Sequence, residues 1–518
     1  MQGKSTQKFL LCAALFMQTV IPSFGQDQPK VVFTGTPWAV QGISTNGEWI
    51  CGVKQETEAY RFNVKTEKLD VIPATNNWTS LIAALDIMDD GTICGMDDEG
   101  NCALWRSAEK GWEKLPTTLH TPGSDKSANA LYACTSDGKY LVGMLSIEND
   151  GSQPWSIMPT LWTKGDDGTY TEEDLPAPET DFEGRKPQWV SPRQMSNDGS
   201  VISGTIQNRG GSNPAAIIWV KGDDGKYAYS TPFYDYAYNI DKYKEIQAQE
   251  PDYSDYTEGT MSERYAAYMK DYIDWYYRLK TEGTTCRAFA PNPIMSDNGK
   301  FIAGEAAKYE YTKTDTEVKT STTIFPGIYE TATGTFTTYE DAGIGMGPNG
   351  ITDNGDMVFS YEDDIYLLLY GKKKPVKLTE YLKEKYGFDL KAMLPGNLYT
   401  FGETSDISSD GRMIVARYKQ TDQSGEITAQ NVYCLLLPEV ITGITKLLGA
   451  DDNAAVYVDG GVLHLPEGAT EATVYDISGK RVASAKSGNV DMASARRGIY
   501  LVRYNIDGKT AKAKVLNK

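Results

Sequence analysis

Short alternating apolar segments, separated by glycine-containing polar turns, recur along most of the chain. Seven of them share one order: an Asn-Gly or Asp-Gly turn, an aliphatic strand residue and, two positions later, a small residue. They span 43–52, 87–95, 134–143, 195–204, 295–304, 351–360 and 407–416. Asn-Gly and Asp-Gly between apolar runs are strong hairpin signals, because type I′ turns need positive φ at both central residues. The repeated small residue predicts the close approach of a neighbouring backbone or side chain.

Each segment is followed by an aromatic-bearing strand, a polar turn and a returning strand, which gives four strands per unit. Repeat periods of this size are typical of stacked or radial units. The pattern therefore predicts an all-β fold, a seven-bladed β-propeller over residues 26–440. The string VVFTG at 31–35 is expected to supply the strand that closes the ring. One interval between successive turn glycines is unusually long, so eight blades or a six-plus-one arrangement remain open.

The units resemble extracellular propeller repeats of the form IS-x-DG-x-x-VVG, followed by a Trp and a Leu, and the match covers about 31–440. Propellers of this kind serve as binding scaffolds, enzyme cores and adhesins. The resemblance therefore implies a fold without selecting a function.

An insertion at about 236–284 interrupts the fourth unit and has a different periodicity. Thr260 and Glu263 have the spacing of a helix capping box. Apolar and aromatic residues then recur every three or four positions, which predicts an amphipathic helix. The aromatic stripe either packs on the propeller or forms a platform that contacts carbohydrate or protein. The candidate binding residues are Tyr265, Tyr268, Tyr272, Trp275 and Tyr276.

Residues 1–25 have the pattern of a signal peptide. Lys4 and Lys8 precede an apolar run at 9–21, and small residues follow it. The run is too short to anchor the chain in a membrane, and no later segment is long and apolar enough to span one. Cys12 lies inside the apolar run, which disfavours lipidation. We expect export through the periplasm and no transmembrane segment in the mature protein.

The last part of the chain, 441–518, changes to short strands with Gly and Asp turns, which predicts a small β-sandwich. The strings VYDISGKRV (474–482), GIYLV (498–502) and KVL (514–516) resemble the type A C-terminal sorting domain of the type IX secretion system of Bacteroidetes. The residues that carry this resemblance include Gly479, Lys480, Gly498, Tyr500 and Lys514. It implies that the type IX machinery is a partner, that the protein is secreted or attached to the outer-membrane surface, and that the tail is removed. An ordinary terminal sandwich is the alternative.

The charge distribution argues against nucleic acid as a partner. The 518 residues contain 51 Lys and Arg against 70 Asp and Glu, for a net charge of −19. The first 25 residues carry +2 and the tail carries +3, which leaves −24 on the body. Phosphate backbones recruit basic surfaces, not acidic ones.

Few residues are suited to metal or redox chemistry. The two histidines, His120 and His464, cannot build a His-rich zinc site. The GDDG turns at 165–168 and 222–225 lack the spacing of a calcium loop. We therefore expect no metal and no cofactor. Cys51 and Cys94 occupy the same place in two repeats, which favours buried thiols over the disulfides that export would permit.

No nucleophile elbow, zinc-protease, P-loop or paired C-x-x-C motif occurs. The sequence thus favours a secreted or cell-surface propeller that acts as a non-catalytic binding or adhesion protein for a protein or glycan ligand. An extracellular enzyme that degrades glycan or peptide with carboxylates at the propeller mouth is the alternative. A structural component of the envelope is a third.

Overall fold

The computed structural model describes residues 28–517, except for 36–38, 55–57, 74–82, 124–128, 149–155, 209–214, 290–293, 362–363, 395–397, 401–405, 422–426, 440–455, 460–461, 466–467, 477–479, 488, 493–494, 496–497 and 507–508. The predicted signal peptide and Gly479 lie outside the described residues. The chain divides into two compact units. The first contains residues 1–235, 359–366 and 376–440, and the second contains 236–358, 367–375 and 441–518.

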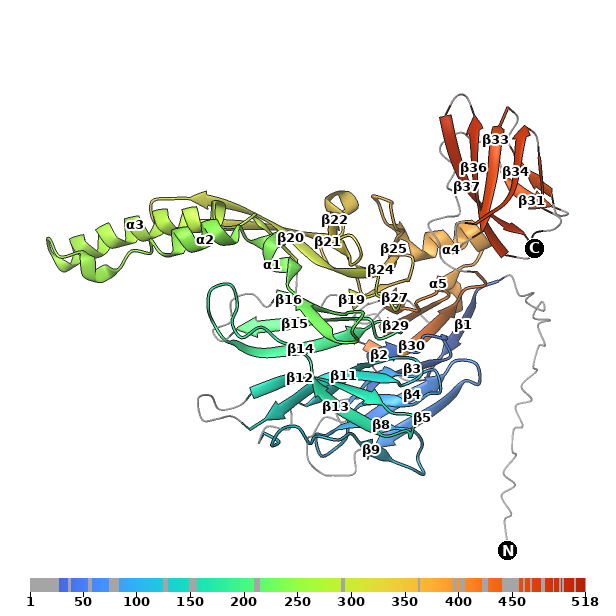
Figure 1. The fold of residues 1–518 in the computed structure, drawn as a ribbon, viewed down its shortest axis with the longest axis horizontal. Helices are drawn as coiled ribbons and strands as arrows, with labels where there is room; N and C mark the ends of the chain where they lie inside the picture. Colours follow the sequence, from blue (N-terminus) through green and yellow to red (C-terminus); the bar gives the residue numbers. More distant parts are fainter. Residues whose placement is uncertain are drawn as a thin grey trace, which may run out of the picture. The chain divides into compact units, whose positions relative to one another are not determined.

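Antiparallel sheets follow one another through the first unit (Figure 1). One sheet contains β2 (Ala39–Ile43), β3 (Trp49–Lys54), β4 (Glu58–Asn63) and β5 (Lys68–Pro73). The next contains β6 (Ala83–Ile87), β7 (Ile93–Met96), β8 (Cys102–Trp105) and β9 (Trp112–Lys114). Two further groups of four strands are joined into one sheet by a parallel contact between Ile157 and Trp189. They are β10 (Ala130–Cys134), β11 (Tyr140–Ile147), β12 (Ser156–Lys164) and β13 (Tyr170–Asp174), then β14 (Pro187–Met195), β15 (Val201–Asn208), β16 (Ala215–Lys221) and β17 (Tyr227–Ser230).

The last sheet of this unit combines the two ends of the propeller region. Its strands are β1 (Lys30–Phe33), β27 (Leu398–Thr400), β28 (Asp406–Ile407), β29 (Met413–Thr421) and β30 (Ile427–Leu436). β1 pairs antiparallel with β30, and Val32 lies opposite Cys434. This confirms the strand predicted at 31–35. Two helices, α4 (Leu378–Tyr386) and α5 (Leu390–Met393), precede this sheet and were not predicted from the sequence.

Apolar side chains fill the space between successive sheets. Phe62 of β4 belongs to the same buried cluster as Val415 of β29. The next sheet boundary buries Cys51 with Ile93, and the one after it buries Leu104 with Trp162. Because neighbouring sheets pack face to face in chain order, the fold is mostly β and propeller-like.

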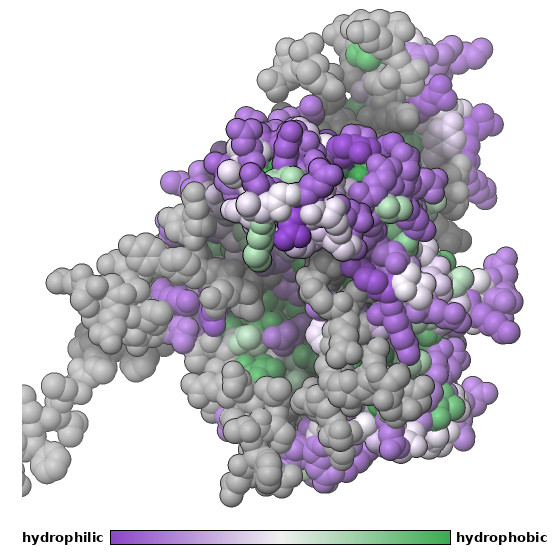
Figure 2. Space-filling view, turned by 90° about the vertical axis from the view of Figure 1, so that its left-hand side faces the viewer, coloured by the Kyte–Doolittle hydropathy of each residue, from purple (hydrophilic) through white to green (hydrophobic). Residues whose placement is uncertain are grey.

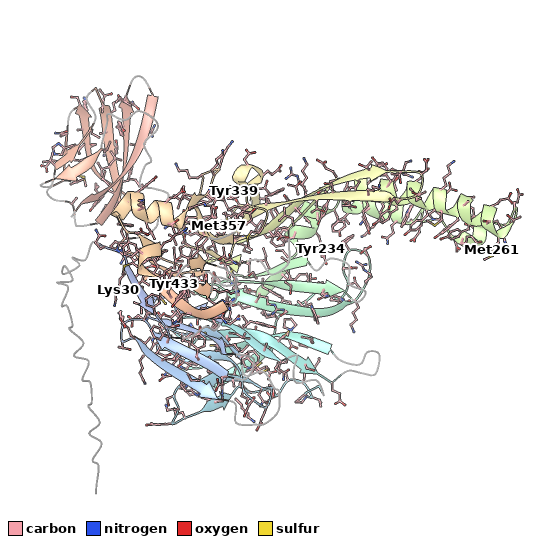
Figure 3. The ribbon with its side chains drawn as sticks, turned by 180° about the vertical axis from the view of Figure 1, so that it is seen from behind. Lys30, Tyr234, Met261, Tyr339, Met357 and Tyr433 are labelled. Carbon is pink, nitrogen blue, oxygen red and sulfur yellow. The ribbon has the colours of Figure 1, made fainter. Side chains whose placement is uncertain are left out.

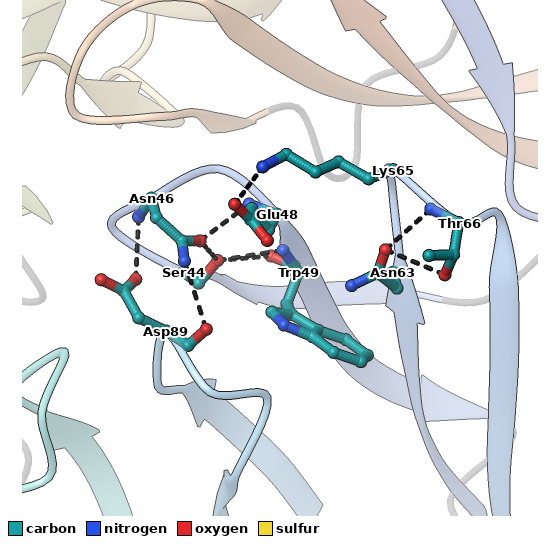
Figure 4. A network of polar contacts seen from close by, with 8 residues as sticks. All are labelled: Ser44, Asn46, Glu48, Trp49, Asn63, Lys65, Thr66 and Asp89. Atoms are coloured by element: carbon teal, nitrogen blue, oxygen red, sulfur yellow. Dashed lines mark hydrogen bonds and ion pairs between the residues drawn. The ribbon is translucent and has the colours of Figure 1, made fainter.

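Hydrogen bonds between the repeated turns link neighbouring sheets. In Figure 4, the backbone N–H of Asn46 donates to Asp89 Oδ1 at 2.8 Å, and the Asn46 amide donates to the Asp89 carbonyl at 3.2 Å. The chain of links continues from Asp89 N–H to the Ser136 carbonyl, and from Ser136 N–H to Asn197 Oδ1. All seven turn glycines have positive φ, as predicted, but the Asn or Asp before each of them does not, so these are not the type I′ turns that the sequence suggested. These links use Asn46, directly before its glycine, and Asp89, Ser136 and Asn197, each two places before its glycine.

In the first four repeats the small residue faces a backbone carbonyl of the preceding strand. A Cβ on Gly52 would lie 1.9 Å from the Ala39 carbonyl oxygen, and one on Gly95 would lie 1.7 Å from that of Ala83. The register of each first strand shifts beside these contacts, as at a β-bulge. A bulge bends its strand, and here it brings the carbonyl against the glycine. The predicted close approach is therefore confirmed.

Buried tryptophans add a second kind of link. Trp162 Nε1 donates to the Pro116 carbonyl at 2.8 Å, and Trp219 Nε1 donates to the Pro176 carbonyl at 2.6 Å. Both indoles are fully buried. Pro116 follows β9, and Pro176 follows β13, so each tryptophan is bonded to the segment after the preceding group of four strands. The indole N–H is thereby satisfied without water.

In the second unit, helices α2 (Ile240–Gln247) and α3 (Met261–Thr281) confirm the predicted helical insertion, and α1 (Pro232–Ala237) leads into it. One sheet follows, with strands β18 (Arg287–Phe289), β19 (Ile294–Met295), β20 (Phe301–Lys313), β21 (Val318–Glu330) and β22 (Thr335–Thr338). Another sheet, whose residues are divided between the two units, has the order β23 (Gly350–Ile351), β24 (Met357–Tyr361), β25 (Asp364–Leu368) and β26 (Val376–Lys377). None of the described helices combines the length and hydrophobicity that a membrane span requires.

The C-terminal residues form two sheets around one core. The smaller sheet contains β31 (Tyr457–Asp459), β32 (Val462–His464) and β35 (Val490–Asp491). The larger contains β33 (Thr470–Asp476), β34 (Arg481–Ser487), β36 (Gly498–Ile506) and β37 (Lys509–Asn517). Leu463 from the first sheet and Val502 from the second share a buried cluster, so this part is a small β-sandwich, as predicted.

The six cysteines in the described part of the chain are free thiols. Cys51 and Cys94 are fully buried, which confirms the prediction made from their repeated position. Burial, with Asp86 and Cys94 nearby, raises the pKa of the Cys51 thiol well above its ordinary value. Burial also raises the pKa of Cys434 to about 12. These thiols are therefore protonated and behave as small apolar side chains.

Candidate binding surface on the inserted arm

Two helices and a long hairpin form an arm that carries the predicted binding residues. The arm consists of residues 238–285, with helices α2 and α3, and the outer part of the β20–β21 hairpin, residues 308–323 (Figure 1). Helix α3 lies along β20, and Lys313 Nζ of the hairpin is 2.6 Å from the Asp274 carboxylate of the helix. The hairpin thus supports one side of α3.

Helix α3 starts at a complete capping box. The Thr260 hydroxyl accepts a hydrogen bond from Glu263 N–H, and the Glu263 carboxylate accepts one from Thr260 N–H at 2.8 Å. This backbone hydrogen bond lowers the pKa of Glu263. A capping box satisfies two of the free N–H groups at a helix start, so it fixes where α3 begins. Figure 3 labels Met261, the first residue of the helix, which is 75% exposed.

The inner half of α3 packs on α2. Trp275 is 8% exposed and belongs to a cluster with Ile246 and Leu279. Its indole Nε1 donates to the Ile246 carbonyl of α2 at 2.8 Å. This hydrogen bond and the apolar contacts hold the two helices together.

Tyrosine rings form a continuous row along α3, the tyrosine ladder. Its members are Tyr253, Tyr256, Tyr265, Tyr268, Tyr272 and Tyr276. Along the helix, the centroid of the Tyr268 ring lies 6.3 Å from that of Tyr265 and 5.8 Å from that of Tyr272. From the segment before the helix, Tyr253 and Tyr256 meet the Tyr268 ring edge-on, at 5.5 and 5.7 Å.

The exposure of the ladder rises toward the start of α3. Tyr272 and Tyr276 pack against the α2–α3 cluster, whereas Tyr265 is 57% exposed and Tyr253 is 37% exposed. In Figure 2, which shows the left-hand face of Figure 1, the coloured side chains nearest the viewer are mostly hydrophilic or of intermediate hydropathy. Tyrosine suits such a surface, because it offers an apolar ring with a polar tip. The outer end of the ladder is therefore available to a partner.

Carboxylates lie near two of the ladder phenols, Tyr256 and Tyr272. The Tyr256 hydroxyl donates to Asp271 Oδ2 at 2.8 Å, and this hydrogen bond raises the pKa of Tyr256 to about 12. Burial raises the pKa of Tyr272, and the Glu250 carboxylate raises it further. At neutral pH these rings are hydroxyl donors beside negative charges.

No family model matches the chain, and neither does any curated protein. Solved structures match with low identity. An oligogalacturonate lyase in complex with manganese is 11% identical, with 79% of this chain and 93% of that chain covered and a TM-score of 0.41. A second oligogalacturonate lyase, from Vibrio parahaemolyticus, is 10% identical over 79% and 94%, with a TM-score of 0.40. The WD40 repeats of RRP9 are 11% identical over 79% and 97%, with a TM-score of 0.32. At these values the likenesses decide neither fold nor activity.

The structure divides the predicted binding residues by burial. Tyr265 and Tyr268 lie toward the exposed end of the ladder, and Trp275 lies in the α2–α3 contact. Tyr253 and Tyr256 complete the ladder but were not predicted, since they precede the periodic segment. The signal that could have found them is Asp252, which caps the short 3-10 turn Tyr253–Asp255.

The residues of the sorting-domain resemblance occupy the C-terminal sandwich. Tyr500 is 5% exposed and lies in its core. Lys480 is exposed, and its N–H donates to Asp476 Oδ1 at 3.0 Å. Gly498 and Lys514 are strand residues of β36 and β37, where Lys514 pairs with Leu501.

His120, His464 and Asp86 each have a local polar partner. His120 Nε2 is 2.8 Å from Asp174 Oδ2, and His464 Nδ1 is 3.2 Å from the Asn489 amide. The Asp86 carboxylate accepts hydrogen bonds from the N–H groups of Ile87 and Cys134. Within the described ranges, no group of three or more His, Cys, Asp or Glu side chains is arranged to hold a metal ion.

Proposed function

We propose that this chain is a secreted or surface-attached binding protein in which a seven-bladed propeller carries the arm and the tyrosine ladder contacts the ligand. The ladder carries the proposal: Tyr265 and Tyr253 are exposed aromatic residues in ring contact with further tyrosines behind them. A protein keeps such a contiguous exposed aromatic surface mainly where a partner covers it. A ligand of this surface is an extracellular protein or glycan.

Seven blades are supported by the repeat and by strand pairing. The sequence has seven copies of the turn segment, and β1 completes the sheet of the last one. Propeller scaffolds avoid long open sheet edges, because each sheet packs between two others. A rigid scaffold of this kind suits an arm that has to present side chains in fixed positions.

Asp86 is a poor candidate for the alternative, hydrolysis by facing carboxylates. Asp86, on the first strand of its sheet, uses both carboxylate oxygens to accept backbone hydrogen bonds. A carboxylate held in this way stabilises local structure and is poorly placed to act on a substrate.

The binding proposal is tested by a double variant, Tyr253→Ala with Tyr265→Ala, against a glycan array and immobilised extracellular proteins. We expect at least about tenfold weaker binding to any ligand of the wild-type protein, because exposed aromatic anchors carry much of the binding energy. Tyr229→Ala is the matched control, since Tyr229 is 41% exposed outside the arm. Equal binding by the wild-type protein and the double variant would contradict the proposal.

Export is proposed on the signal peptide and on the resemblance of the tail to type IX sorting domains. In the organism that encodes the chain, the wild-type protein is expected on intact cells or in the medium. A variant that lacks 441–518 is expected to accumulate in the periplasm. Equal surface exposure of the two would count against a sorting role for the tail.

A further inference from the structure

The segment that leads into α3 and carries Tyr253 and Tyr256 is acidic. The segment from residue 250 to 263 contains no Lys or Arg, and its acidic residues are Glu250, Asp252, Asp255, Glu258 and Glu263. Asp252 and Glu263 cap the turn and the helix. Glu250, Asp255 and Glu258 are exposed, and they make no ion pair in the part of the chain that the structure describes.

Three carboxylates, those of Asp271, Asp255 and Glu250, act on rings of the ladder. Asp271 bonds the Tyr256 hydroxyl, and the charge of Asp255 also acts on Tyr256. Glu250 acts on Tyr272 in the same way. The nearest bases that follow on α3 are Arg264 and Lys270. Aromatic faces and carboxylates together form a surface that attracts cations.

The arm already shows how its rings receive a lysine. At the inner end of the ladder, Lys280 Nζ lies 5.2 Å from the centroid of the Tyr276 ring. On the side of the hairpin, Lys313 Nζ lies 5.9 Å from the centroid of the Tyr277 ring and contacts the Asp274 carboxylate. A cation within about 6 Å of a ring centroid is attracted by the ring. The Tyr277 ring and the Asp274 carboxylate together hold the Lys313 ammonium group.

We infer that the outer end of the ladder docks a lysine- or arginine-bearing segment of a partner protein. The aliphatic stems of that segment lie on Tyr253, Tyr265 and Tyr268, and its charged ends reach Glu250, Asp255 and Glu258. Lysine and arginine side chains are suited to this, because they cover apolar surface with their stems and keep the charge at a polar rim. The inference rests on the proposed binding function of the arm and names the chemistry of its partner.

The test is fluorescence anisotropy of fluorescein-labelled decalysine with the full-length protein. The arm variant carries Glu250→Gln, Asp255→Asn and Glu258→Gln, which leaves the caps intact. The control variant carries Glu109→Gln, Asp166→Asn and Asp223→Asn, three exposed acids outside the arm. Both variants lose three negative charges, so they separate a local site from general attraction by an acidic protein.

We expect the arm variant to bind decalysine about tenfold more weakly than the wild-type protein and the control variant to stay within about twofold. Tyr265→Ala should weaken binding about two- to fivefold, and Tyr265→Phe should keep it, because a cation needs the ring face and not the hydroxyl. Binding should weaken as salt is added, since the pairs are exposed.

Equal loss in the arm and control variants would overturn the inference, because the attraction would then be nonspecific. Binding of neutral oligosaccharides at the ladder, with no preference for decalysine over a Gly-Ser peptide, would also overturn it and would leave the binding function of the arm standing. If Tyr253 and Tyr265 variants change the binding of no ligand at all, the proposed function itself is wrong.

Discussion

The sheets of the first unit and the arm use aromatic residues in opposite ways. In the sheets, Trp219 is fully buried and its indole N–H bonds a backbone carbonyl. In the arm, Tyr265 is 57% exposed and touches only other tyrosines of the ladder among the rings described. The first arrangement gains stability from burial. The second leaves the ring face exposed, so that a binding partner can cover it.

Trp275 shows where the boundary between the two arrangements lies. It belongs to the same helical stripe as Tyr268 and Tyr272, but it is buried and bonds Ile246 as Trp219 bonds Pro176. Within the arm, therefore, the inner part is built like the sheets and only the outer part is built for contact. Substitutions should reproduce this division.

The largest effect is expected for Trp219→Ala. Loss of a fully buried indole should lower the free energy of unfolding by about 3–5 kcal/mol, as for other large-to-small core substitutions. Urea denaturation followed by circular dichroism measures it. Trp219→Phe keeps most of the volume and should lose only about 1–2 kcal/mol, the cost of an unpaired carbonyl and a smaller ring. If Trp219→Ala lowered the free energy of unfolding by less than about 1 kcal/mol, the buried aromatic residues of the sheets would not differ in stability from the exposed ones of the arm.

A smaller effect on stability is expected where an aromatic ring packs against a turn glycine. Gly199 has φ +69°, and a Cβ there would lie 2.6 Å from the Tyr140 ring. Gly199→Ala should cost about 2–3 kcal/mol, from backbone strain and the clash together. Gly168→Ala is the control, because Gly168 has φ +84° with nothing within 4 Å, and it should cost about 1 kcal/mol. Thermal melting of both variants separates the clash from the strain.

The buried thiols predict a loss of stability at high pH. The pKa of Cys434 is raised to about 12 in the fold, against 9.0 as its ordinary value. Between these values the unfolded chain has released the proton and the folded chain has kept it. Stability must therefore fall as pH rises from 9 toward 12, by up to about 1.4 kcal/mol per pH unit for each such group. Unfolding free energies at pH 8, 9.5 and 11 test this, and Cys434→Ala should show a shallower slope. An unchanged slope would show that other groups cause the loss.

The smallest effect is expected for Tyr265→Ala. Because the side chain is more than half exposed, its loss should change the free energy of unfolding by no more than about 0.5 kcal/mol. Urea denaturation beside Trp219→Ala gives the direct comparison. A loss above 2 kcal/mol would mean that the outer ladder is a structural element like the inner part.

Sequence reasoning reached the repeated turn because its chemistry is local. Each turn needs its own glycine after Asn or Asp, and each following strand needs its own small residue. Both can therefore be identified in the sequence one unit at a time. The same holds for the capping box of α3, which involves only Thr260 and Glu263. These features depend on neighbours in the chain and not on the rest of the fold.

What the sequence could not show depends on distant partners. An apolar helical stripe is wide enough to hold both Tyr272 and Trp275, and only the position of α2 determines that Trp275 is buried. Tyr253 lies outside the periodic segment, so its contact with Tyr265 is set by how the preceding loop returns. Helices α4 and α5 are short, and their apolar positions are too few to stand out from the strand pattern around them.

The pairing of β1 with β30 joins distant parts of the chain. Thr34 bonds the Val432 carbonyl, and these residues are 398 positions apart in the chain. The sheets between them are meanders of neighbouring strands, which can form as each stretch of about forty residues becomes available. Completing the last sheet requires β1 and β30 to meet, at an entropic cost that grows with the length of the chain between them. Without β1, the β30 edge would be unpaired, and an unpaired strand edge can pair with other chains.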